Sequence, residues 1–287
     1  MKNIDWHAGF VSAMKLELIE NETDLDYIEE RHIANRAQRI DLLIIRNDTN
    51  AQIVNPIGAI FGRFNICEYK SPGQPLAYSD FYKTLAYACL LLEETQKPCH
   101  NGAAKYTMTI VREAYPRDLF KLLRADGIGI TLAESGIYRL TGNLPFRTQV
   151  IITGSSPEQV SWLGCLTKKG TEYDLEHIVA NTLVLDGTHK KEADIIMDIF
   201  TSANRELVVK EMEEPDMCNA VNELFADKIK EMEAIVADKD SLLADKDSLL
   251  ADKDLTIADK DAIIAKLQAQ IDQLHAQLAE KSNPKKS

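Results

Sequence analysis

The stretch Arg39–Pro72 contains two apolar segments that predict the centre of the fold, RIDLLII at Arg39–Ile45 and FGRFNICEYK at Phe61–Lys70. A turn-rich segment, Asn47–Gly58, separates them, and a Ser-Pro-Gly sequence follows the second. Short runs rich in Ile, Phe and Tyr that are bounded by Asn, Pro and Gly are typical of β-strands. We therefore expect a β-hairpin here, with the rest of the chain arranged around it.

Charged residues interrupt both predicted strands. Asp41 lies inside the first apolar run, and Glu68 and Lys70 lie at the end of the second. Side chains two apart on a strand share a face, so Glu68 and Lys70 point the same way and Tyr69 points to the other side. Charges at such positions are costly unless they have partners or bind a ligand. Two carboxylates that converge from adjacent strands beside an ammonium group predict a divalent-metal site.

The arrangement Asp41…Glu68-x-Lys70 resembles the PD-(D/E)XK nuclease superfamily, and the order of predicted elements is similar to its transposase or recombination-promoting nuclease-like branch. The resemblance covers roughly residues 5–155 and implies a helix, a meander of three strands, a second helix and a further strand. It assigns metal binding to Asp41 and Glu68, and it places Lys70 beside the attacking water. Ile40 stands where the family motif often has proline.

A first helix is predicted at Trp6–Asn21, where apolar residues recur at helical spacing and Asp5 precedes them as a cap. In the resembled family, a glutamate of the first helix often completes the metal shell. Glu17 is the residue that matches, because Glu20 falls nearer the end of the helix. The alternative is that Glu17 is an ordinary solvated side chain.

The remaining segments up to residue 156 predict an α/β domain. Strands are expected at Leu25–Asn35, Tyr106–Ala114, Gly129–Leu140 and Phe146–Thr153, and helices at Pro75–Glu94 and Pro116–Leu123. We expect a restriction-endonuclease-like mixed central sheet flanked by helices, which forms a nuclease-like domain over residues 1–156. Six bases lie between residues 112 and 147, and they either line a DNA groove or are scattered on the surface: Arg112, Arg117, Lys121, Arg124, Arg139 and Arg147.

From Pro157 onward the pattern is helical. Helices are expected at Pro157–Leu166, Tyr173–Leu185 and Lys191–Met212, and they form a helical subdomain over residues 157–217. No side-chain pattern in this region predicts a chemical function.

The last part of the chain contains a heptad repeat. Ala-Asp-Lys-Asp recurs at 237, 244, 251 and 258, which is a period of seven. This repeat predicts a long coiled-coil helix over residues 218–281 that self-associates, and a disordered tail over 282–287. Four lysines occupy consecutive d positions, so a single helix stabilised by Asp–Lys pairs is the alternative.

The composition is that of an ordinary soluble protein of 287 residues, with 45% apolar and 27% charged residues. Five cysteines without a Cys-x-x-Cys pair fit a reducing compartment, and no segment predicts a membrane helix or a leader peptide. We therefore expect a cytoplasmic protein. The net charge of −12 lowers the expected non-specific affinity for DNA.

Two hypotheses about function follow. The first is a Mg²⁺-dependent DNA endonuclease, with Mn²⁺ as a substitute metal, linked to transposition or recombination through the family resemblance. The second is a catalytically inactive scaffold that keeps the nuclease fold and assembles through the heptad tail. A phosphate-handling NTPase is disfavoured, because the chain has no Gly-x-x-x-x-Gly-Lys loop.

Overall fold

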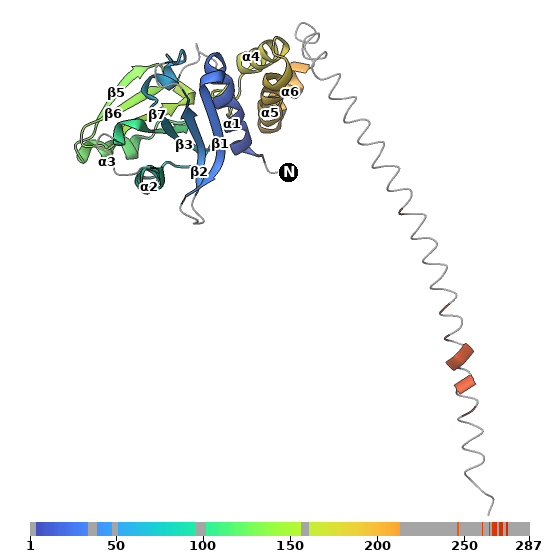
Figure 1. Cartoon of the computed structure of the whole chain (residues 1–287). Helices are drawn as coiled ribbons and strands as arrows, with labels where there is room; N and C mark the ends of the chain where they lie inside the picture. The colour runs from blue at the N-terminus through green and yellow to red at the C-terminus, as the bar shows by residue number, and fades with distance from the viewer. Residues whose placement is uncertain are drawn as a thin grey trace, which may run out of the picture. The chain divides into compact units, whose positions relative to one another are not determined.

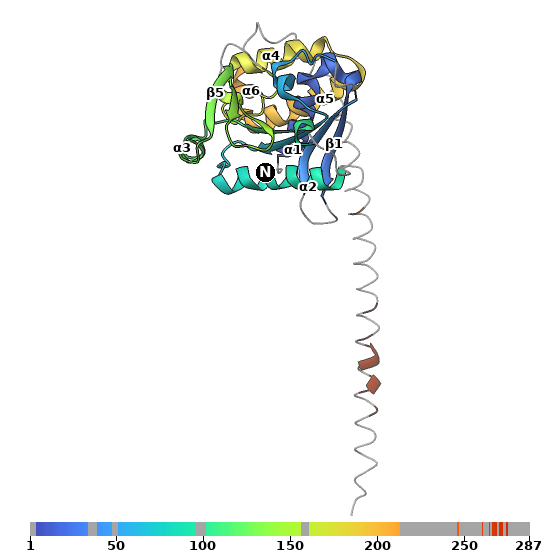
Figure 2. The ribbon, with the colours of Figure 1, turned by 60° about the vertical axis from the view of Figure 1, so that its left-hand side comes forward.

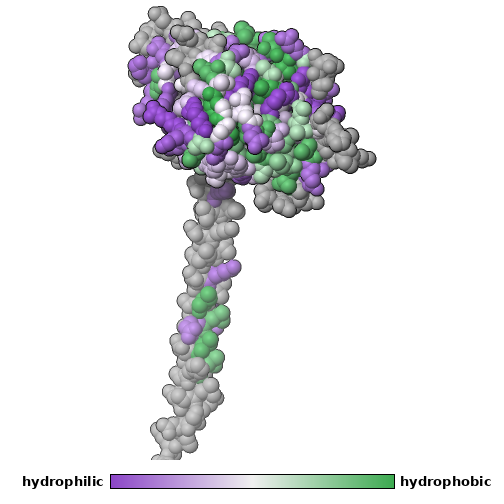
Figure 3. Space-filling view, turned by 90° about the vertical axis from the view of Figure 1, so that its left-hand side faces the viewer, coloured by the Kyte–Doolittle hydropathy of each residue, from purple (hydrophilic) through white to green (hydrophobic). Residues whose placement is uncertain are grey.

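The computed structural model describes residues 4–33, 39–47, 51–95, 102–155 and 161–212, together with scattered residues of the tail between 246 and 274. The chain divides into two compact units, Met1–Asn222 and Glu223–Ser287. The predicted coiled coil at 218–281 and the predicted disordered tail at 282–287 lie almost entirely outside the described residues. Tail residues that are described, among them Ile264, Leu267, Ile271 and Leu274, are helical and exposed, and green residues mark the tail in Figure 3.

The first unit is built on a seven-stranded mixed sheet in the order β1-β2-β3-β4-β7-β6-β5. The strands are β1 (Leu25–His32), β2 (Arg39–Arg46), β3 (Phe64–Lys70), β4 (Tyr106–Arg112), β5 (Gly129–Glu134), β6 (Ile137–Thr141) and β7 (Arg147–Ile152). β3, β4 and β7 are parallel to one another, and the other neighbours are antiparallel. The predicted mixed central sheet flanked by helices is confirmed.

The two faces of the sheet carry different helices. Helices α2 (Tyr78–Thr95) and α3 (Arg117–Ala125) cover one face, and Figure 2 shows α2 lying along it. Their apolar side chains, such as Phe81 and Phe120, form a core with Ile110 of β4. Helix α1 (Trp6–Glu17) covers the other face, where the ring of Phe10 stacks on the ring of Tyr69 from β3 with 4.9 Å between centroids.

Helices α4 (Glu172–Leu183), α5 (Gly187–Ala203) and α6 (Arg205–Met212) lie beyond α1, on the side away from the sheet (Figure 1). Gly9 allows α1 and α5 to approach each other closely, because a Cβ at this position would overlap the side chain of Ile199 in α5. Lys15 Nζ of α1 lies 3.0 Å from Glu192 Oε1 of α5. The helical region therefore packs on the sheet domain through α1 within one compact unit.

Three sequence predictions about elements are wrong in detail. Gly129–Leu140 is not one strand, because the chain turns at Ser135 and Gly136, where Gly136 has φ 74°, and forms the β5–β6 hairpin. The expected helix at 157–166 is absent from the described part, 161–166, which forms turns. The expected helix at 191–212 begins earlier and is interrupted at Asn204, which separates α5 from α6.

On the face of the first unit in Figure 3, hydrophilic and hydrophobic residues are interspersed. None of the helices that the structure describes is long and apolar enough to cross a membrane.

Candidate metal and nuclease site

Asp41 and Glu68 come together on the α2 face of the sheet. β2 and β3 are antiparallel and pair Leu42 with Cys67, which makes Asp41 and Glu68 neighbours across the two strands. The Oδ2 atom of Asp41 accepts a hydrogen bond from the backbone N–H of Tyr69 at 2.9 Å. The hairpin predicted from the sequence therefore brings two carboxylates together at one edge of the sheet.

The carboxylate of Glu68 is buried without full hydrogen bonding. Its Oε1 atom is inaccessible to solvent and accepts no hydrogen bond from any residue that the structure describes. Burial, and next the negative charge of Asp41, raise the pKa of Glu68 to about 8, and a hydrogen bond from the Asp41 backbone and the charges of Lys83 and Lys70 limit the rise. A buried carboxylate oxygen without a hydrogen-bond partner lowers the stability of the fold unless the carboxylate binds a cation or a proton.

Lys70 lies on the same face, two residues beyond Glu68. Its Nζ atom is 3.0 Å from Oδ1 of Asp80, in the first turn of α2. The other oxygen of Asp80 accepts the backbone N–H of Ala77 at 2.9 Å, which fixes the carboxylate. The ammonium group of Lys70 is thus positioned from α2.

Lys83 is a second base beside the two carboxylates. Its Nζ lies 5.3 Å from the centre of the Tyr87 ring. Its pKa is raised first by a hydrogen bond to Tyr87, against the effect of burial, and further by Glu68 and Asp41. Asp80 and Lys83 thus add an acid and a base from α2. Both lie on the first turns of α2, the part of this helix that follows the end of β3 most closely in the sequence.

A strained residue accompanies the site on the neighbouring strand. Glu30 of β1 has φ 47°, in the left-handed region that non-glycine residues rarely adopt. Its neighbours Glu29 and Arg31 pair with Leu42 and Ile40, which places Glu30 opposite Asp41. Strained backbone of this kind is frequent at functional sites.

The structure does not bring Glu17 to this site. Glu17 ends α1, which covers the opposite face of the sheet from Glu68 and Lys70. Its Oε1 accepts the backbone N–H of Leu163 at 3.1 Å, and its Oε2 accepts Nδ2 of Asn55 at 3.2 Å. Glu17 therefore links α1 to two loops. The predicted three-ligand set of Asp41, Glu68 and Glu17 is not assembled here.

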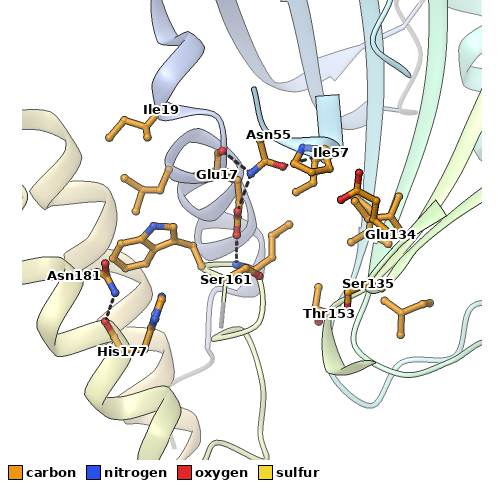
Figure 4. A pocket seen from close by; sticks show the side chains of 18 of the residues that line it. Glu17, Ile19, Asn55, Ile57, Glu134, Ser135, Thr153, Ser161, His177 and Asn181 are labelled. Atoms are coloured by element: carbon orange, nitrogen blue, oxygen red, sulfur yellow. Dashed lines mark hydrogen bonds between the residues drawn. The ribbon is translucent and has the colours of Figure 1, made fainter. Parts of the chain in front are cut away.

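Glu17 instead lines a cavity of about 630 Å³ (Figure 4). The opposite wall includes Glu134, Ser135 and Thr153, and the helical region contributes residues such as His177. Burial raises the pKa of Glu17, and its hydrogen bonds oppose that rise. Neither Asp41 nor Glu68 is among the described residues that line this cavity.

Among the residues that the structure describes, no group of three or more His, Cys, Asp or Glu side chains is placed to hold a metal. The acidic pair of Asp41 and Glu68 is a two-carboxylate site. Mg²⁺ suits such a site, because it commonly binds one or two carboxylates and keeps several of its waters.

In comparisons with known proteins, no family model, no curated protein and no solved structure matches the chain. A functional interpretation therefore depends on the fold and on the geometry of the site.

Proposed function

We propose that the protein is a metal-dependent DNA endonuclease of the PD-(D/E)XK type. The observation that carries this proposal is the buried Oε1 of Glu68, which has no hydrogen-bond partner in the described part of the chain and lies beside Asp41. Lys70 shares the face of Glu68 and supplies the positive charge that such a site requires. The element order from α1 through β4 supports the same class, since it matches the order that the family resemblance implies.

In this proposal, Asp41 and Glu68 hold Mg²⁺ or Mn²⁺ through carboxylate oxygens. When bound, the ion would lower the pKa of a coordinated water and neutralise charge on the scissile phosphate. Lys70 would orient the attacking water and stabilise negative charge in the transition state. Asp80 would keep the ammonium group in place during this step. Self-association through residues 218–281 would bring two sites to one duplex, and the family resemblance suggests a role in transposition or recombination.

The test is cleavage of supercoiled plasmid in Mg²⁺ or Mn²⁺. We expect nicking or linearisation by the wild type, and its loss in Asp41→Asn, Glu68→Gln and Lys70→Ala. Glu134→Gln is the matched control, because Glu134 is an exposed acid of β5. The proposal fails if the three site variants cleave at the wild-type rate.

One observation favours the scaffold hypothesis as a second candidate. Lys70 is already ion-paired with Asp80, and a pKa of about 8 keeps Glu68 largely neutral near pH 7 when no cation is bound. Such a polar cluster is compatible with an inactive nuclease fold. A wild type that cleaves neither plasmid nor short duplexes, and whose melting temperature is unchanged by Mg²⁺ or Mn²⁺, would favour the scaffold.

A further inference from the structure

A second cavity, of about 380 Å³, adjoins the proposed site through Lys70. The loop from Ser71 to Pro75 forms one wall, and residues that follow β4 form another. The third wall belongs to the segment between the sheet and α4, at Lys168 and Lys169. The cavity thus joins the carboxyl edge of the sheet to the helical region.

The charge of this cavity is opposite to that of the whole protein. Four bases line it, and Glu113 is the acid among its described lining residues; the bases are Lys70, Arg112, Lys168 and Lys169. The carboxylate of Glu113 accepts a hydrogen bond from the hydroxyl of Thr167. In a chain of net charge −12, the lining of this cavity is therefore net positive.

Arg112 connects this cavity to the proposed catalytic lysine. β3 and β4 are parallel, and their register pairs Lys70 with Arg112. Paired residues of adjacent strands project to the same face, about 5 Å apart. The Nε atom of Arg112 is buried and donates no hydrogen bond to any residue within the described ranges. Arg112 as a whole is half-buried, so the rest of its side chain is partly accessible at the edge of the sheet.

The two lysines are held on a fixed loop. Asn204, which is buried, donates from Nδ2 to the carbonyl oxygen of Thr167 at 2.9 Å and accepts the N–H of Gly170 at Oδ1, also at 2.9 Å. The backbone N–H of Lys169 donates to the Thr167 hydroxyl at 3.0 Å. Both lysine side chains are exposed, and Nζ of Lys168 lies 5.9 Å from the centre of the Trp6 ring.

We propose that this basic cavity, lined by Arg112, Lys168 and Lys169, binds the backbone phosphates of DNA next to the scissile phosphate. The proposal rests on the proposed nuclease function, since Lys70 belongs to both sites. Guanidinium and ammonium groups are the usual protein donors to phosphate oxygens. The DNA strand then runs along the carboxyl edge of the sheet, from β3 past β4 to the loop of Lys168. The segment before α4, for which the sequence predicts no chemistry, becomes part of the substrate site.

The test measures binding separately from cleavage. Full-length protein in EDTA is titrated into a fluorescein-labelled DNA duplex at several salt concentrations. Lys168→Ala/Lys169→Ala is compared with Lys190→Ala/Lys191→Ala, which removes two exposed lysines from α5 outside the cavity. The logarithm of the DNA-binding constant falls linearly with the logarithm of the salt concentration, and the steepness of this line is the salt slope. Loss of two phosphate contacts should reduce the salt slope by about 2 and weaken binding about tenfold more at 50 mM than at 200 mM salt.

Arg112→Gln is a second variant, and it should reduce the slope by about 1. An unchanged slope in Lys168→Ala/Lys169→Ala, an equal reduction in the α5 control, or no duplex binding by the wild type would overturn the proposal. Plasmid cleavage by the same variants separates the two proposals. If the wild type cleaves plasmid and Lys168→Ala/Lys169→Ala binds and cleaves DNA equally well, the phosphate site is rejected and the nuclease proposal stands. If the cavity variants lose DNA binding but the wild type does not cleave plasmid, the nuclease proposal is rejected and a DNA-binding cavity remains.

Discussion

Replacing Glu68 by glutamine should change how stability depends on pH, whether or not the protein cleaves DNA. The pKa of Glu68 is raised from 4.5 to about 8, chiefly by burial and next by Asp41. Between these two values the native state holds a proton that the unfolded state has released. The free energy of unfolding of the wild type therefore falls as pH rises through this window. Glutamine keeps the shape of the side chain and removes this titration.

The expected size follows from the raised pKa. At about 1.4 kcal/mol for each pH unit, an upward change from 4.5 to about 8 corresponds to up to about 5 kcal/mol. The stability of Glu68→Gln minus that of the wild type should be smallest near pH 5, rise with pH and level off above about pH 8. Urea unfolding in EDTA at several pH values measures this difference. Glu134→Gln is the control, because Glu134 is an exposed acid of β5 away from this site.

Added Mg²⁺ makes the same experiment informative about the metal. An ion that binds the charged carboxylates stabilises the native state by an amount that grows with the logarithm of its concentration and reaches about 2.7 kcal/mol at a hundredfold excess over the dissociation constant. We expect Mg²⁺ at pH 8 to stabilise the wild type and to have little effect on Glu68→Gln. A constant stability difference between pH 5 and pH 9 in EDTA would refute the argument that Glu68 is buried beside Asp41.

Three further variants test other parts of the structure. Glu17→Ala should lower the free energy of unfolding in urea by about 1–3 kcal/mol, because the buried N–H of Leu163 loses its acceptor. The variant should still cleave DNA, and loss of cleavage at full stability would instead make Glu17 a site residue. Asn204→Ala should cost about 1–3 kcal/mol and weaken DNA binding by freeing the loop of the two lysines, whereas unchanged binding would show that the loop needs no anchor. Gly62→Ala should cost about 1–3 kcal/mol, since a Cβ would overlap the carbonyl oxygen of Lys105, and a wild-type urea midpoint would contradict this close approach.

The centre of the fold was predictable from the sequence because its strands are short apolar runs and its helix has one buried apolar stripe. The strand and helix periodicities of residues 39–95 are local signals, and charges inside apolar strands indicate that Asp41 and Glu68 have a special role. These signals do not say on which face of the sheet a helix packs. Glu17 was therefore placed with the wrong partners, although its helix was correctly expected.

The segment at 161–170 could not be predicted for a related reason. Its hydrogen-bond partners are Glu17, Glu113 and Asn204, which are distant in the sequence. A local reading of this segment finds apolar residues at helical spacing and predicts a helix. Instead, tertiary contacts take up the backbone N–H groups of Leu163 and Gly170, and the N–H groups of residues 164–167 bond within the segment in turns. The basic cavity was missed because it combines residues from three separate segments.

Helix α1 limits how this protein can be shortened or recombined. One side of the helix contacts Tyr69 of the sheet, and the other contacts Ile199 of α5. A fragment that stops at residue 156 would expose the α5 side of this helix to water and leave Lys15 without its partner Glu192. Limited proteolysis or gene truncation at that point should therefore yield an aggregation-prone product. Exchange of segments between related proteins would have to transfer the sheet and the helices after it as one block.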